Sequence, residues 1–267
     1  MNVRNECIVL ILVAVTAVAG DDKTPGEHAG GQKTFLACPI VRDTKTVPCW
    51  LTEYQGETYY LGIQVDQAAA FQPPQLLHQV LVEGTVKPGA RICGGIVLDP
   101  VKISVMPELD YTCNTMLPAV DEYSVPFAPR GPGPNKAQPL APLRFPTPAE
   151  PKPPFTVREF TLYYDFDGER AGRMAHVITD AMLYAKASHA KRVEIVGYRA
   201  AVRLSDGKAL EEYPWIAQHR AEIMADTLRE IGVPGSIIST SWKSDAENGS
   251  GMDASLKRRL TITVTPE

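Results

Sequence analysis

The sequence predicts an α+β protein built from two units, a small β-rich unit at residues 32–125 and a β-α-β-α-β unit at residues 155–267. Three observations support this prediction. Residues 126–154 contain eleven prolines, a density that no helix or central strand tolerates. Before this stretch, apolar and polar residues alternate with the period of strands. After it, strand-like runs alternate with longer runs of helical period, and the 267-residue chain is long enough for a core in each unit.

The N-terminus predicts export. A short segment with one arginine precedes an apolar run at residues 7–19 that ends in Ala-Val-Ala, which is the pattern of a signal peptide cleaved after Ala19. The run is short for a membrane span, and an uncleaved anchor is the alternative. We expect a signal peptide at residues 1–19 and a mature protein that is periplasmic or associated with the outer membrane.

The charge pattern argues against nucleic acid as a partner. The net charge is −4 and the sequence pI is about 5.8, with lysines and arginines scattered along the chain. Nucleic-acid-binding domains usually gather such residues into a basic patch. We therefore expect no nucleic-acid partner.

The first unit has the alternation of a small β structure. Val80 and Val82 alternate with Leu81 and Glu83, and a similar pattern runs through residues 59–66. The run RICGGIVLDPVKISVM adds one or two strands around a proline turn. We expect a small disulfide-linked barrel or sandwich, and no residue in it carries recognisable chemistry.

Four cysteines remain once the predicted signal peptide is removed, and all lie in the first unit: Cys38, Cys49, Cys93 and Cys113. An even number in an exported β-rich unit indicates two disulfides, for which three pairings exist. We favour Cys38 with Cys49 and Cys93 with Cys113, because these pairs close short loops. A four-cysteine zinc site is the alternative, but the C-x-x-C pairs usual in such sites do not occur, so we expect no metal.

The proline-rich stretch at residues 126–154 predicts an extended spacer. In a polyproline conformation it would span roughly 90 Å at about 3.1 Å per residue. Such segments also bind aromatic grooves. A spacer that presents the β unit away from the second unit is the role we expect.

The second unit predicts three strands and two helices. The strands are FTLYYDFDG, RVEIVGY and RRLTITVTP, with a short apolar segment SIIST before the last. The first helix lies in ERAGRMAHVITDAMLYAKA and the second at about residues 215–231. The first helix has one apolar stripe, formed by Ala171, Met174, Ile178, Ala181, Met182 and Ala185.

The first of these strands ends in D-F-D-G at residues 165–168, the form in which haloacid dehalogenase-like phosphatases present an aspartate nucleophile. Such enzymes also need a later lysine and an acidic pair that holds Mg²⁺, and the rest of the unit offers neither. The chain also lacks a nucleophile elbow, a Walker loop and histidines at metal-ligand spacing. We therefore expect no catalytic residue, no enzyme activity and no cofactor.

Four segments of the second unit carry a resemblance to a known family: YYDFDG at 163–168, VEIVGY at 193–198, HRAEIMADTLREIGV at 219–233 and KRRLTITV at 257–264. Together they resemble the OmpA-like domain, the C-terminal peptidoglycan-binding domain of outer membrane protein A and its relatives. The resemblance covers residues 155–267 and implies non-covalent binding to peptidoglycan. In that family an arginine pairs with the carboxylate of diaminopimelate, and an aspartate pairs with its ammonium.

Carried over by position, the resemblance implies a ligand site at Arg220, Arg259 and Ala200. Ala200 stands where the family has its aspartate, so the motif is degenerate. The loop between that position and the second helix is longer than usual, and Asp206 or Glu211 in it could supply the missing acid.

Arg220 can also be interpreted without the family. It falls at the edge of the apolar stripe of the second helix, where a guanidinium is partly desolvated and needs an anion. The sequence supports two hypotheses for the partner of Arg220 equally. The first is an internal ion pair with Asp206, Glu211 or Glu212, and the second is the carboxylate of an external ligand.

Two functions stay open from the sequence. The first is an exported cell-envelope protein whose OmpA-like domain binds peptidoglycan. The second is an envelope scaffold or protein-interaction module that has lost this ligand, with envelope proteins as partners.

Overall fold

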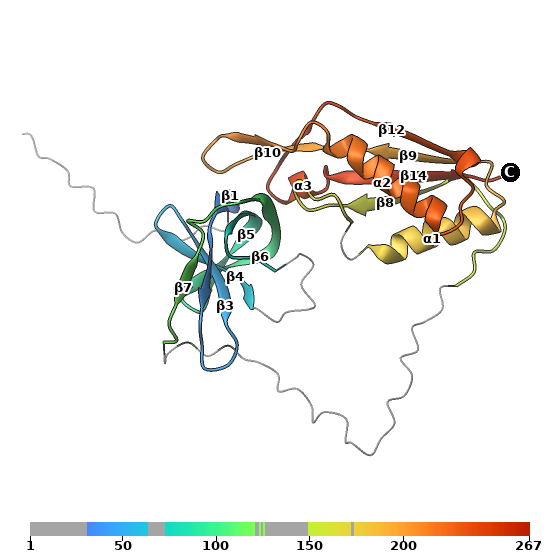
Figure 1. The fold of residues 1–267 in the computed structure, drawn as a ribbon. Helices are drawn as coiled ribbons and strands as arrows, with labels where there is room; N and C mark the ends of the chain where they lie inside the picture. Colours follow the sequence, from blue (N-terminus) through green and yellow to red (C-terminus); the bar gives the residue numbers. More distant parts are fainter. Residues whose placement is uncertain (1–30, 64–72, 121–122, 124, 126–148, 172–173) are drawn as a thin grey trace, which may run out of the picture.

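A computed structural model describes residues 31–63, 73–120, 123, 125, 149–171 and 174–267. The predicted signal peptide and residues 126–148 of the predicted spacer lie outside the described residues. The described part of the chain forms two sheet-rich units with three α-helices (Figure 1). It also contains two disulfides. None of its helices has the length and apolar character that a membrane span requires.

The N-terminal unit contains one curved seven-stranded sheet in the order β1-β5-β6-β4-β3-β2-β7. Neighbouring strands are antiparallel except for the pairs β4 with β6 and β2 with β7. The described strands of this unit therefore form one sheet, whereas the sandwich considered from the sequence would have two packed sheets. The strands are β1 Gln32–Ala37, β2 Pro39–Arg42, β3 Cys49–Tyr54, β4 Glu57–Ile63, β5 His78–Ile92, β6 Gly95–Leu109 and β7 Thr115–Leu117.

Both faces of β5 are buried. Val80 and Val82 point into the core of the N-terminal unit, as their alternation predicts. Leu81 and Glu83 lie on the opposite face and are also fully buried, although alternation usually marks a face that meets water. The second unit covers this opposite face.

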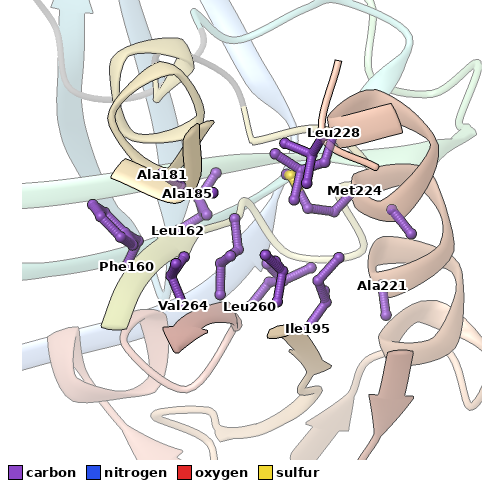
Figure 2. Close-up of a cluster of buried hydrophobic side chains, with 14 of the residues drawn as sticks. Phe160, Leu162, Ala181, Ala185, Ile195, Ala221, Met224, Leu228, Leu260 and Val264 are labelled. Atoms are coloured by element: carbon purple, nitrogen blue, oxygen red, sulfur yellow. The ribbon is translucent and has the colours of Figure 1, made fainter. Parts of the chain in front are cut away.

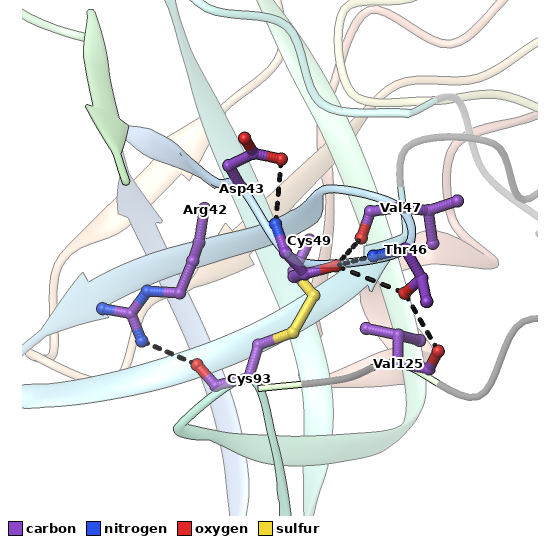
Figure 3. The surroundings of a disulfide bond; sticks show 8 residues. Arg42, Asp43, Thr46, Val47, Cys49, Cys93 and Val125 are labelled. Atoms are coloured by element: carbon purple, nitrogen blue, oxygen red, sulfur yellow. Dashed lines mark hydrogen bonds between the residues drawn. A yellow bond between two sulfur atoms is a disulfide. The ribbon is translucent and has the colours of Figure 1, made fainter. Parts of the chain in front are cut away.

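The disulfides connect Cys38 with Cys113 and Cys49 with Cys93, so the expected pairing of neighbours in sequence is wrong. Strand order decides the pairing. The parallel pairing of β7 with β2 brings Cys113 beside Cys38, and the turn between β5 and β6 carries Cys93 to the start of β3. Figure 3 shows this second bridge, where Arg42 Nη1 donates to the Cys93 carbonyl at 2.8 Å.

The C-terminal unit has a four-stranded sheet in the order β12-β9-β14-β8. β12 runs parallel to β9, and β14 is antiparallel to both β9 and β8. The predicted β-α-β-α-β order is found in β8 Arg158–Tyr163, α1 Ala175–Ala187, β9 Arg192–Gly197, α2 Ile216–Glu230 and β14 Arg259–Thr265. A further strand, β12 Ile238–Trp242, begins within the apolar segment SIIST.

Further elements join this order as insertions. A second, three-stranded sheet has the order β11-β10-β13, and a short helix α3 follows β13. A 3₁₀ turn, η1, precedes β12. Their bounds are β10 Ala200–Arg203, β11 Ala209–Glu211, η1 Gly235–Ile237, β13 Glu247–Ser250 and α3 Met252–Ser255.

Both long helices pack on one face of the four-stranded sheet, and Figure 2 shows their apolar side chains facing those of the strands. The helix predicted from residue 169 onward begins only at Ala175. Gly197 at the end of β9 allows α2 to approach, because a Cβ there would lie 2.0 Å from the Ala217 carbonyl oxygen. β8 ends at Tyr163, so the D-F-D-G segment follows the first strand instead of ending it.

Candidate functional site

The two units contact each other through one face of β1, β5 and β6, which we call the docking face. Cross-strand register aligns its residues in two rows. Because successive side chains of a strand point to opposite faces, residues two apart in each strand point the same way. The rows are Leu36, Leu81 and Ser104, and next to them Thr34, Glu83 and Lys102.

The D-F-D-G segment binds this face. Phe166 is 1% exposed and packs with Leu81 and with Met106 of β6. Its backbone N–H donates to Ser104 Oγ at 3.0 Å. Asp165 Oδ1 lies 2.8 Å from Lys102 Nζ. The segment that suggests a phosphatase nucleophile therefore lies in the contact between the two units.

The β10–β11 hairpin makes a second contact with the docking face. The Thr34 N–H donates to Ser205 Oγ at 2.9 Å, and the Ser205 N–H donates to the Thr34 carbonyl at 2.7 Å. Val202 and Ala254 add apolar contacts to the cluster around Phe166.

A fully buried ion pair crosses the same contact. Arg258 Nη1 and Nη2 donate to the two carboxylate oxygens of Glu83 at 3.0 and 2.5 Å. Both side chains are 0% exposed. Arg258 Nε also donates to the Tyr164 carbonyl at 3.4 Å. Planar, bidentate pairing of this kind is what arginine and carboxylate geometry favours.

Arg220 of α2 is also 0% exposed, and its ion-pair partner is Glu212. Nη2 and Nη1 donate to the two Glu212 oxygens at 2.6 and 3.2 Å. Three backbone carbonyls take the other donors: Gly168 accepts from Nε at 2.8 Å, Tyr198 from Nη1 at 3.1 Å and Asp165 from Nη2 at 3.3 Å. All five N–H donors of the guanidinium thus have an acceptor.

Glu212 is saturated in turn. Besides Arg220, its carboxylate accepts from the Ala200 N–H at 2.8 Å and from the Asp167 N–H at 3.0 Å. The Ala200 side chain is fully buried beside it. Of the two hypotheses for Arg220, an internal ion pair is the one that the structure contains, and Glu212 is the partner among the three acids named.

Asp167 adds a second acid to this buried cluster. Its side chain is 9% exposed, and Oδ1 accepts from the Tyr213 N–H at 2.7 Å. Burial, followed by the charge of Glu212, raises the pKa of Asp167 to about 7, against the opposing effect of Arg220. Burial likewise raises the pKa of Tyr164, whose ring lies 4.5 Å from the Arg220 guanidinium, to about 12.

Two other predicted ligand positions, Asp206 and Arg259, have partners of their own. Asp206 lies in the β10–β11 turn, where hydrogen bonds from the Lys208 backbone and side chain lower its pKa. Arg259 Nη1 and Nη2 bind Glu247 at 2.7 and 2.9 Å, and the guanidinium lies 4.0 Å from the centroid of the Tyr198 ring. Hydrogen bonds from Arg259 lower the pKa of Glu247.

Sequence reasoning missed the docking face, Glu83 and Arg258. The available signal was Leu81, an apolar residue on the face of β5 that alternation assigned to water. Among the described residues, one group has metal-ligand spacing, formed by Cys38, Asp110 and Cys113. Both of its sulfurs belong to a disulfide, so it offers no thiolate to an ion.

Comparison with known proteins gives a weak likeness in structure alone. No protein-family model and no curated protein matches the chain. Among solved structures, the chain is similar to the OmpA-like domain of FopA1 from Francisella tularensis subsp. tularensis SCHU S4. The identity is 15% and the TM-score 0.30, over 41% of this chain and 73% of that one.

Proposed function

We propose that the chain is an exported cell-envelope protein whose OmpA-like unit serves as a scaffold that holds the β unit for protein partners, without binding peptidoglycan. The observation that carries this proposal is the Arg220 guanidinium, which is buried and has all its donors paired within the chain. The resemblance of residues 155–267 to OmpA-like domains supports the envelope, and the predicted signal peptide supports export.

The buried pair of Arg220 and Glu212 would oppose binding of the family's ligand. A diaminopimelate carboxylate would have to displace Glu212, which would leave that acid buried without its cation. Breaking a buried ion pair in this way costs about 3–5 kcal/mol. The ligand's ammonium would find Ala200 instead of an acid, and it would lose a charge-assisted hydrogen bond of about 1.5–3 kcal/mol. Together these costs would lower the affinity by roughly a thousand-fold or more.

The docking face gives the scaffold its physical basis. The D-F-D-G segment, the β10–β11 hairpin and Arg258 all bind the β unit. A β unit held by one buried apolar cluster, the hydrogen bonds of the hairpin and an ion pair has a defined orientation, which a free spacer would not provide. In this proposal the D-F-D-G segment is a docking element and no residue of it is a nucleophile.

Sedimentation with purified cell-wall sacculi tests the proposal. The full mature chain is expected to stay in the supernatant under conditions in which a peptidoglycan-binding OmpA-like domain pellets. Affinity purification from solubilised envelopes is expected to recover a stoichiometric protein partner without muropeptides. Saturable pelleting that free diaminopimelate competes away would overturn the proposal.

If the protein does pellet, two matched variants locate the binding. Arg220→Lys changes the buried guanidinium, and Arg229→Lys changes an exposed one on the same helix. Loss of pelleting in the first variant alone would assign the ligand to Arg220. Ala200→Asp is unsuitable as a gain-of-binding variant, because its carboxylate would be buried beside Glu212.

A further inference from the structure

We propose that docking of the two units is linked to a proton held at Asp167, so that the units separate more readily as the pH rises toward neutrality. The proposal concerns regulation of the junction and does not depend on the proposed function. It rests on a cluster of buried charges at the point where the D-F-D-G segment meets the docking face.

The cluster has more acid than base. Asp167 and Glu212 are both buried, with Asp167 9% and Glu212 1% exposed. The Arg220 guanidinium is bonded to the Glu212 carboxylate and acts on Asp167 through its charge. With both acids ionised, a negative charge is buried without a cation of its own, which is costly. A proton on Asp167 removes that charge and keeps the Oδ1 acceptor of the Tyr213 N–H.

Other charged groups around Asp167 do not neutralise it. Most of them are engaged in pairs of their own, and Glu108 of β6 acts in the same direction as Glu212. The loop of Asp167 itself carries Asp165, which pairs with Lys102 of β6, Glu169, which pairs with His219 of α2, and Arg170. The strand β6 contributes Glu108. Arg258, just before β14, pairs with Glu83 of β5.

The β unit supplies part of this unfavourable environment. Val105 and Pro107 of β6 line a hollow of about 350 Å³ together with the segment from Asp165 to Arg170. The hollow gives solvent protons access to Asp167. Separation of the units would remove these walls and the charge of Glu108, and would return Asp167 toward water.

The sign of the linkage follows from this difference. In the docked state, burial and then the charge of Glu212 raise the pKa of Asp167 to about 7. In this proposal the walls and the Glu108 charge of the β unit account for part of that rise, so the pKa falls when the units separate. Docking is therefore strongest below the pKa that Asp167 has in the separated units. It weakens as the pH rises from that value to about 7, and it is constant above. Each unit of difference between the two pKa values changes the docking equilibrium about ten-fold.

Amide hydrogen exchange in the full mature chain tests the proposal. Three backbone amides donate across the junction, those of Phe166, Thr34 and Ser205. Their protection factors, corrected for the intrinsic rate at each pH, are expected to fall at least about ten-fold between pH 5 and pH 8. The amide of Ile195, inside the core sheet of the C-terminal unit, should keep its protection, which separates undocking from global unfolding.

Two variants and one further measurement complete the test. Asp167→Asn removes the titration and keeps the side-chain shape, so its junction amides should stay protected across the range. Asp226→Asn, on the exposed surface of α2, should behave as wild type and controls for net charge. Small-angle scattering of wild type should show the radius of gyration increasing over the same pH interval. Constant wild-type protection, or an equal fall in Asp167→Asn, would overturn the proposal.

Discussion

The buried pair of Glu83 and Arg258 allows a sharp test of the docking face. Replacing Glu83 with Gln keeps the shape of the side chain and removes its charge, which leaves the Arg258 guanidinium buried without a counter-charge. Because both side chains are 0% exposed and the pair is bidentate, we expect a loss of about 3–5 kcal/mol in the free energy of unfolding. For a protein of this size that corresponds to a decrease in Tm of roughly 6–20 °C.

Urea and thermal unfolding of the disulfide-intact protein measure this loss. Glu194→Gln is the matched control, because its pair with Arg192 is largely exposed, and it should cost less than about 1 kcal/mol. A double variant, Glu83→Leu with Arg258→Met, should recover most of the stability, since an apolar pair of similar volume avoids the desolvation cost. A Glu83→Gln protein as stable as the control, or a double variant whose loss equals the sum of the single losses, would refute the buried pair.

Three further predictions concern the bridges, the sheet and the D-F-D-G segment. Proteolysis of the unreduced mature protein should release the two cross-linked peptides of the pairing described above and essentially no free thiol; peptides linked in another pairing would contradict it. Gly197→Ala should cost about 2–3 kcal/mol or more because of its contact with α2, whereas Gly235→Ala, which meets only ordinary contacts, should change stability by less than about 0.5 kcal/mol. Asp165→Asn should lower the free energy of unfolding by about 1 kcal/mol, because it removes the pair with Lys102. Neither wild type nor variant should show Mg²⁺-dependent phosphatase turnover. Turnover in wild type that the variant lacks would support the phosphatase hypothesis instead.

The order of elements in the C-terminal unit is local information, and the sequence determined it. Strand and helix periods appear within runs of a few residues, so β8, α1, β9, α2 and β14 could be placed from pattern alone. The sequence also predicted that Arg220 needs an anion, because helical spacing alone places it beside an apolar stripe. Even there the degree of burial was underestimated, since Arg220 is fully covered.

The choice of partner was decided only by the tertiary structure. Asp206, Glu211 and Glu212 lie close together in sequence and have similar chemistry, so spacing cannot rank them. The β10–β11 hairpin places Ser205 at the docking face, Asp206 in its turn with Lys208, and Glu212 at Arg220. The disulfide pairing has the same origin, because short loops favour neighbours in sequence while the strand order of the sheet brings distant cysteines together.

The sequence by itself determined the periods of strands and helices, the four cysteines of the β unit, and the residues that needed partners. It could not determine that the two units bind each other, because Glu83 and Arg258 are 175 residues apart and each has the ordinary appearance of a surface charge. Only when the sheet register brings Leu81 and Glu83 onto one face does that face become a docking surface. Long-range contacts depend on register and strand order, which arise from the packing of the whole chain.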